Sequence, residues 1–528
     1  MQQSPPGTRK PQATGTWLLA ATILGSSMVF IDGSVVNVAL PTIQTELGAS
    51  AAATQWIVEA YALLLAALIL AGGALGDKFG RRRLFVLGTA VFAATSIWCG
   101  LAPNIGNLIA ARAAQGIAGA ILTPASLSLI TAGFDDDTTR GKAIGTWSGF
   151  TAITTAFGPV LGGWLVEHAS WRWVFFINIP LAAAVLAISV VHLQESRDED
   201  AQDVDWAGAA LSTLGLGGLV FALIEAPARG WTNPVVFLPF IGGIACLFAF
   251  IVVESRSAAP MMPLELFRSR TFSGTNLLTL MLYAALGGAL YFLPFLLIQV
   301  QGYSSTGAGA ALLPFVLLMF ALSRWSGGLI GKYGAKLPLV IGPCIAAAGF
   351  VVFAIAGTSG SYWTTWFPAA TILGFGMAVT VAPLTTAVMG SVDQRRSGVA
   401  SGINNAVART ASLLAIALFG IVVAFTFNSR LDTRLDDIDL APEHRIAVED
   451  QKHDLAAAEP PADLDEPTRD RVQSAIDDAF ITGFRVAMWI GAGMAIVSAI
   501  AAYALIDGKL STNPAPASHG AADEAASP

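Results

Sequence analysis

Charged residues are scarce in this chain. Asp, Glu, Lys and Arg together make up 12% of its 528 residues, whereas apolar side chains make up 54%. Soluble domains carry a charged share of about 25%, so this composition argues against a water-soluble globular fold. The charges are also unevenly spread and leave long apolar runs between them. The composition therefore predicts an all-α polytopic membrane protein.

Cysteine is rarer still, and the motifs of soluble enzymes are missing. Cys99, Cys246 and Cys344 all fall within apolar runs and show neither CxxC nor metal-ligand spacing. The sequence has no G-x-x-x-x-G-K-[ST] phosphate loop, no HExxH and no GxSxG. We therefore expect no metal site, no cofactor, no enzymatic activity and no nucleic-acid partner. No cleavable signal peptide is expected before the first apolar run.

Fourteen apolar runs are long enough to cross a bilayer, which takes about 20 residues each. They lie at 17–40, 54–75, 84–102, 107–131, 143–167, 172–193, 206–226, 234–254, 272–299, 307–330, 337–357, 364–389, 398–426 and 480–506. The short outer loops carry only Arg172 and Arg229. The segments on the other side hold most of the basic residues, including Arg9, Lys10, Lys78, Arg81, Arg82, Arg83, Arg395, Arg396 and Lys509. The positive-inside rule then predicts that both termini are cytoplasmic.

Two stretches of the chain read alike. Residues 73–80 and 327–334 share glycine, leucine, lysine, an aromatic residue and a closing glycine in register, with Asp77 replaced by Gly331. Such repetition is typical of transporters built from two halves, with a site near the bilayer midplane. We predict a tail (1–16), a six-helix half (17–193), a linker with an inserted hairpin (194–271, helices 206–226 and 234–254), a second six-helix half (272–506) and a tail (507–528). The hairpin is expected to be peripheral.

One outer loop, residues 427–479, accounts for the net charge of −7. Between Asn428 and Ala479 the sequence holds fifteen acidic and six basic residues. We interpret it as a solvated, partly helical acidic loop, with a cation-collecting or docking role as the alternative.

Two acids interrupt the apolar runs. Asp32 is the only charged residue between Lys10 and Glu46 and lies in the middle of the first run. A charge at the centre of a spanning helix costs roughly 2.5–3.5 kcal/mol, so Asp32 is predicted to be a proton, ion or substrate site. Glu59 lies in the outer half of the second run. It is either a second such site or an interfacial acid that reaches outer water.

One face of the fourth run carries Arg112, Gln115, Gly116 and Gly119, at i, i+3, i+4 and i+7. A buried guanidinium keeps its proton and must find a carboxylate, a carbonyl or water. Arg112 is therefore a candidate partner of Asp32, with a carbonyl-satisfied structural arginine as the alternative.

Four motifs resemble signatures of one transporter family. Residues 31–41 are similar to its first-helix signature, including Asp32, Asn37 and Pro41. Residues 73–83 resemble its loop signature, and 108–116 its fourth-helix signature. The fifth run resembles its antiporter signature through Gly145, Gly158, Pro159, Gly162 and Gly163, although Thr154 occupies one glycine position. The chain is thus identified as a member of the major facilitator superfamily, and specifically of its fourteen-span drug:proton antiporters.

The resemblance implies a major facilitator fold and proton-coupled export of amphiphilic, cationic small molecules by a monomer in a bacterial cell membrane. It implies proton coupling by Asp32, Arg112 and Glu59. It places Asp32, Glu59, Asn37 and Gln115 at a largely apolar substrate cavity between spans 1, 2, 4 and 5 and their second-half counterparts. It assigns a cytoplasmic gate to Gly73, Asp77, Gly80, Arg81 and Arg82, and an export-associated helix kink to the fifth-run motif.

Two rival functions stay open: export of lipids or a lipophilic metabolite, and a non-transporting sensor, against which the gate loop and the Gly-Pro motif argue. Residues 171–180, which include Asn178, also resemble a family stretch, but we interpret their aromatic residues as a membrane-interface anchor. Glu254, near the end of a run, is expected to be wetted.

Overall fold

The computed structural model describes residues 12–134, 136–198, 204–257, 260–355, 361–393 and 396–507. Most of the two predicted tails, with Arg9, Lys10 and Lys509, lies outside the described residues, as does Arg395. The described residues form helices and connecting turns and contain no strand. Among them, fourteen helices are long and apolar enough to cross a membrane, so the predicted number of spans is confirmed.

The first part of the chain supplies six of these spans. Its helices are α1 (Gln12–Leu47), α2 (Ala51–Phe79), α3 (Arg81–Gly100), α4 (Ile105–Gly133), α5 (Asp137–His168), α6 (Trp173–Phe176) and α7 (Asn178–His192). Short polar side chains start several of them: Ser50 accepts a hydrogen bond from the Ala53 amide and Asn104 one from the Asn107 amide. Gly80 separates α2 from α3 at φ 111°, a conformation open to glycine.

The rest of the chain supplies eight spans. Its elements are α8 (Trp206–Arg229), α9 (Pro234–Arg256), η1 (Leu264–Arg268), α10 (Arg270–Phe295), η2 (Leu296–Val300), α11 (Ser305–Ala310), α12 (Leu313–Gly327), α13 (Leu329–Tyr333), α14 (Lys336–Ile355), α15 (Tyr362–Gly390), α16 (Ser397–Asp436), α17 (Pro442–Glu449), η4 (Lys452–Ala457) and α18 (Glu466–Leu505). The run predicted at 307–330 is divided among α11, α12 and α13, with Pro314 in the first turn of α12.

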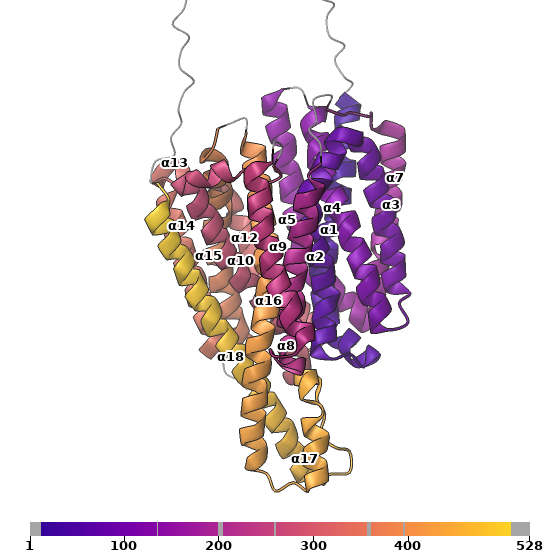
Figure 1. Cartoon of the computed structure of the whole chain (residues 1–528), viewed down its shortest axis with the longest axis vertical. Helices are drawn as coiled ribbons and strands as arrows, with labels where there is room; N and C mark the ends of the chain where they lie inside the picture. The colour runs from indigo at the N-terminus through magenta and orange to yellow at the C-terminus, as the bar shows by residue number, and fades with distance from the viewer. Residues whose placement is uncertain are drawn as a thin grey trace, which may run out of the picture.

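The acidic loop is more ordered than its charge suggested. α16 and α18 have 40 residues each, or about 60 Å at 1.5 Å per residue, twice a bilayer core of about 30 Å. Both project from the bundle toward α17 (Figure 1). Arg430 and Arg434 on α16 donate to the Asp478 carboxylate on α18, at 2.8 and 2.9 Å. The loop is therefore mostly a helical extension held by ion pairs.

The bundle has two ends, which we call the loop end, where α17 lies, and the termini end, where α1 begins and α18 ends (Figure 1). At the loop end, Gln299 of η2 donates to the Gln44 side chain of α1 at 3.2 Å. The Gln44 amide donates in turn to the Asp454 carbonyl of η4 at 3.1 Å. Gln44 thus joins α1, η2 and the outer loop.

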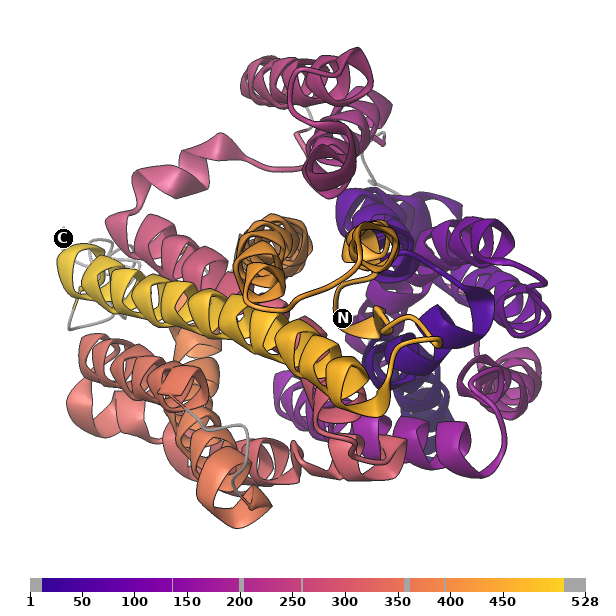
Figure 2. The ribbon, with the colours of Figure 1, turned by 90° about the horizontal axis from the view of Figure 1, so that it is seen from below.

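The inserted pair α8–α9 lies to one side of the bundle (Figure 2). The two helices pack on each other through glycines: a Cβ on Gly218 would lie 2.5 Å from the Pro239 carbonyl oxygen. α8 also packs against α2 and α16. The hairpin is therefore attached to helices from both parts of the chain.

Candidate functional site

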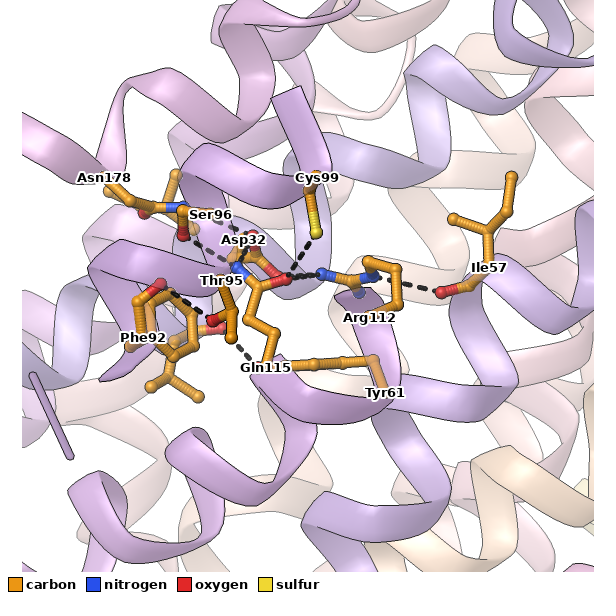
Figure 3. Close-up of polar contacts among 12 residues, drawn as sticks. Asp32, Ile57, Tyr61, Phe92, Thr95, Ser96, Cys99, Arg112, Gln115 and Asn178 are labelled. Carbon is orange, nitrogen blue, oxygen red and sulfur yellow. Dashed lines mark hydrogen bonds and ion pairs between the residues drawn. The ribbon is translucent and has the colours of Figure 1, made fainter. Parts of the chain in front are cut away.

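Asp32 and Arg112 form a buried ion pair across α1 and α4 (Figure 3). Arg112 Nη1 lies 2.5 Å from Asp32 Oδ2, and the two side chains are 1% and 0% exposed. The pairing proposed from the sequence is present in the fold. Such a pair pays a large desolvation cost, so its remaining donors and acceptors must also be satisfied.

Neutral side chains from three helices complete the shell of Asp32. Oδ1 accepts hydrogen bonds from Gln115 Nε2 at 3.0 Å and from Asn178 Nδ2 at 3.3 Å. Both amides also donate to Ser96 Oγ, at 2.9 and 3.3 Å. With its bond from Arg112, the carboxylate accepts three hydrogen bonds in all.

Arg112 has partners besides Asp32. Its Nε donates to the Ile57 carbonyl at 3.0 Å and its Nη1 to Gln115 Oε1 at 2.6 Å. The guanidinium carbon lies 4.1 Å from the centre of the Tyr61 ring, within the range of a cation–π contact. Arg112 therefore contacts both a carboxylate and a carbonyl, and its part in proton transfer stays a prediction.

Small residues on α4 bring these helices together. A Cβ on Gly116 would lie 2.5 Å from the Tyr61 carbonyl oxygen of α2, and one on Gly119 would lie 3.2 Å from Leu65. This close approach lets the Arg112 side chain reach the backbone of α2. The predicted small-residue face of the fourth span thus positions the ion pair.

Glu59 lies deeper than one of its two interpretations allowed. It is 0% exposed, and neither of its carboxylate oxygens has a hydrogen-bond partner among the described residues. The interpretation of Glu59 as an interfacial acid reaching water is therefore wrong, and Tyr61, at 4% exposure, is buried as well. Asn37 Oδ1 is likewise buried without a partner there.

The loop predicted as a gate is anchored to α7. Asp77 and Arg81 form an ion pair at 2.8 Å. Arg82 donates to the carbonyls of Ser189 and Val190, at 3.1 and 3.0 Å. These contacts tie the α2–α3 junction to the end of α7, and a gating role for Gly73, Asp77, Gly80, Arg81 and Arg82 stays a prediction.

The glycine motif of α5 contacts both parts of the chain. A Cβ on Gly162 would lie 2.7 Å from the Val35 carbonyl oxygen of α1, and one on Gly163 would lie 2.6 Å from the Ser305 carbonyl carbon. Gly158 packs on Ser34, and the Pro159 carbonyl lies against Gly309. A Cβ on Gly145 would meet nothing within 4 Å. α5 is therefore tightly packed toward the loop end and loosely packed toward the termini end.

Four participants of the network were not predicted. Asn178, whose stretch we interpreted as an interface anchor, points at Asp32, and Ser96 links it to Gln115 (Figure 3). The Ile57 carbonyl and the Tyr61 ring hold Arg112. An amide in the apolar run 172–193 was the available signal for Asn178, because a buried amide needs partners.

One cavity of the described structure overlaps only in part with the place that the resemblance implies for the substrate. A cavity of about 400 Å³ is lined by residues of α2, α8, α9, η1, α10 and α16 and by Met261 and Met262, whereas α1, α4 and α5 contribute nothing to its wall. Asp32, Asn37, Glu59 and Gln115 are absent from this lining, so their role at a substrate cavity stays a prediction. Glu254, expected to be wetted, is only 3% exposed because the segment before η1 covers it.

Comparison with known proteins gives one consistent result. The family described as Major Facilitator Superfamily matches residues 22–417. Multidrug resistance protein Stp of Mycobacterium tuberculosis is 34% identical, over 91% of this chain and 90% of its own. The tetracenomycin C resistance and export protein of Streptomyces glaucescens is 34% identical, over 92% and 90%. A solved bacterial homologue of the lysosomal transporter Spinster has a similar fold, with TM-score 0.66 and 16% identity over 96% of this chain and 100% of its own.

Proposed function

The chain belongs to the major facilitator superfamily, and on that premise we propose that it is a proton-coupled antiporter that exports amphiphilic, cationic small molecules across a bacterial cell membrane. Its relatives are described as multidrug resistance and antibiotic export proteins. The observation that carries the proposal is the buried Asp32–Arg112 pair. Burying charged groups at membrane depth is costly, and charged residues found there typically mark a proton, ion or substrate site.

We place the termini end in the cytoplasm. Arg81, Arg82 and Arg83 lie at that end beside other basic residues, and the positive-inside rule favours retention of such loops. In this orientation the loop end is extracellular. The tight contacts of Gly162, Gly163 and Gln44 then close the outer side, while α5 is loosely packed on the inner side. In this proposal, a closed outer side is the state in which the transporter receives its substrate from the cytoplasm.

Proton exchange at Asp32 drives the cycle in this proposal. A proton arriving from outside neutralises the carboxylate and weakens its bond with Arg112, and a bound cationic substrate is released outward. After the two halves rock back, Asp32 loses the proton to the cytoplasm and the pair with Arg112 forms again. Exchange of one proton for one monovalent cation moves no net charge, so the pH difference drives it, and each pH unit supplies about 1.4 kcal/mol, enough for a substrate gradient of about tenfold.

The glycine face of α5 is the hinge of that movement. It packs on α1 of its own half through Gly158 and Gly162 and on α11 of the other half through Gly163. Pro159 removes one backbone hydrogen bond within α5 and so permits a bend there. The ion pair of Asp77 with Arg81 steadies the inner loop that precedes α3.

The test is transport by the purified chain in proteoliposomes with an imposed pH gradient. Asp32→Asn is expected to abolish gradient-driven efflux of ethidium and tetraphenylphosphonium. Glu443→Gln, which removes an exposed acid in α17, is the matched control and should transport normally. Full efflux by both Asp32→Asn and Asp32→Ala would contradict the proton-carrier role.

Glu59 is proposed to widen the preference of the exporter toward divalent cations, because its unpaired carboxylate can match a second positive charge. Glu59→Gln is expected to lose efflux of divalent dyes while it keeps efflux of monovalent ones. Equal losses for both classes would indicate that Glu59 shares the proton instead. Unchanged efflux of both would remove Glu59 from the site.

A further inference from the structure

Arg409 is a second cation at membrane depth, and it has no counter-charge. It lies in α16 about 12 residues after Ser397, or about 18 Å along the helix axis at 1.5 Å per residue. The hydrocarbon core is about 30 Å thick, so Arg409 lies near its middle. Among the described residues its side chain makes no hydrogen bond and no ion pair. A guanidinium has five N–H donors and keeps its charge, so these donors need an acceptor.

The side chain of Arg409 faces the first half of the transporter. Its guanidinium carbon lies 5.9 Å from the centre of the Phe30 ring of α1, at the outer limit of a cation–π contact. This contact joins a helix of the second half to one of the first. Arg409 is only half-buried, so the ring covers one side of the guanidinium and leaves donors open between the halves.

The face of α1 that carries Phe30 is incompletely packed. Phe30, Gly33 and Asn37 lie at i, i+3 and i+7, on one side of the helix. Gly33 is exposed, and a Cβ there would meet nothing within 4 Å. The Asn37 side chain makes no hydrogen bond among the described residues. Asp32 points the other way, toward α4 and α7. Space therefore opens beside Gly33, on the side of α1 that Arg409 approaches.

A second polar side chain of α16 accompanies Arg409. Asn405 lies one turn earlier on the same face and is exposed, and its Nδ2 donates to the Ser401 carbonyl of its own helix at 3.1 Å. Neither Asn405 nor Arg409 lines the cavity of about 400 Å³, to which α16 contributes other positions. The two side chains therefore belong to a different surface of α16.

We propose that Arg409 and the Phe30–Gly33 face of α1 form a subsite that binds the carboxylate of an amphiphilic small molecule. The fork of the guanidinium matches the two oxygens of a carboxylate, and such charge-assisted hydrogen bonds are strong. The apolar body of the ligand packs beside Phe30, in the space at Gly33. The subsite extends the range of ligands from cations to zwitterions. Its use in export rests on the proposed function.

The depth of Arg409 distinguishes this ligand from a membrane lipid. A phospholipid phosphate offers the same acceptor chemistry as a carboxylate. It lies at the membrane surface, however, about 15 Å from the middle of the hydrocarbon core. A small amphiphile that enters between the halves carries its own acidic group to Arg409.

Two dyes that differ in one group test the subsite. Tetramethylrhodamine is a zwitterion with a free carboxylate, and its methyl ester is a cation. Binding of each dye to the purified full chain in phosphatidylcholine nanodiscs is measured by equilibrium dialysis. Arg409→Gln is expected to weaken binding of the zwitterion by about tenfold or more and to change binding of the ester by less than about twofold. Arg409→Lys, which keeps the charge without the fork, should lose less.

A matched control and a fold check accompany these variants. Arg229→Gln removes an arginine that is 51% exposed at the end of α8, and it should bind both dyes normally. Helical circular dichroism on heating shows whether each variant is folded. Wild-type affinity of Arg409→Gln for the zwitterion would overturn the proposal. Equal weakening of both dyes would make Arg409 a structural residue and would overturn it too.

Restoring the charge chemically gives a readout that misfolding does not mimic. In a chain with Cys246→Ala and Cys344→Ala, only the buried Cys99 remains, and Arg409→Cys adds one thiol. This variant should lose binding of the zwitterion. A trimethylammonium-bearing methanethiosulfonate should restore it, whereas a sulfonate-bearing one should not. A thiol that reacts with neither reagent, or equal effects of both, would overturn the proposal.

The subsite and the proposed function can fail separately. Asp32→Asn is expected to lose proton-driven efflux but to keep the dependence of zwitterion binding on Arg409, because Asp32 faces α4 and α7. A wild-type chain that binds the zwitterion through Arg409 but exports neither dye refutes the antiport proposal alone. A chain that exports the ester but binds the zwitterion equally well without Arg409 refutes the subsite alone.

Discussion

Removing both charges of the Asp32–Arg112 pair should destabilise the protein less than removing Asp32 alone. In Asp32→Asn the guanidinium of Arg112 stays 1% exposed without a counter-charge, which typically costs 3–5 kcal/mol. The new asparagine also faces two donors, Gln115 Nε2 and Asn178 Nδ2. It has only one acceptor oxygen, because an NH2 group, itself a donor, replaces the other. Arg112→Met is milder, about 1–3 kcal/mol, because Asp32 can take up a proton and keep its amide partners.

The double variant Asp32→Asn with Arg112→Met leaves no buried charge at this site. We expect it to recover about 2 kcal/mol relative to Asp32→Asn. With about 1–3 kcal/mol for Arg112→Met alone, the coupling energy of the cycle is then about 3–5 kcal/mol in magnitude. The assay is the free energy of unfolding in mixed micelles, followed by helical circular dichroism. The control cycle uses Glu225→Gln and Arg229→Met, a pair at 2.6 Å whose arginine is 51% exposed, with coupling below about 0.5 kcal/mol expected. Additive single costs at Asp32 and Arg112, within about 0.5 kcal/mol, would refute this reasoning.

Three further outcomes are expected. Glu59→Gln should raise the free energy of unfolding by roughly 1–3 kcal/mol, since it removes an unpaired buried carboxylate; a loss of stability would reveal a hidden partner. Gly162→Ala should destabilise by about 1–3 kcal/mol because its Cβ meets the backbone of α1, whereas Gly145→Ala should stabilise by up to about 1 kcal/mol. Thermal unfolding of both variants tests this, and a stability change of the same sign in both would contradict the packing of α5. Gln44→Leu should speed amide hydrogen exchange in η4, while the neighbouring Thr45→Ala, whose hydroxyl bonds only within α1, should not; unchanged exchange would mean that Gln44 does not hold the outer loop closed.

The ion pair could be predicted from the sequence because Asp32 and Arg112 are charges in otherwise apolar runs, and each needs a partner that few other residues supply. Asn178 could not be ranked in the same way, since a neutral amide costs less to bury and has many potential partners. The sequence placed Glu59 at a depth along its span but did not say which helices cover it. Its burial follows from tertiary packing that hydropathy does not encode.

The hairpin and the acidic loop show the same limit in another form. The irregular flanks of 206–226 and 234–254 indicate an insertion, yet lipid-facing and protein-facing helix surfaces are equally apolar, so its contact with α2 and α16 was not predictable. In the acidic loop, composition correctly indicated exposure to water. It did not reveal that Arg430 and Arg434 would meet Asp478, a contact that requires two helices to run side by side outside the bundle.

A tilt of α16 and α18 moves the far end of their extension beyond the bundle further than the part inside it. Because Arg430 and Arg434 tie both helices to one carboxylate, the pair can tilt as a single rod whose outer part is about 30 Å long if half of each 40-residue helix lies outside the bilayer. A tilt of about 10° within the membrane then moves its tip by about 5 Å. If the halves rock as we propose, a spectroscopic label on α17 would report that movement from the end of the extension, magnified and without any probe in the transport path.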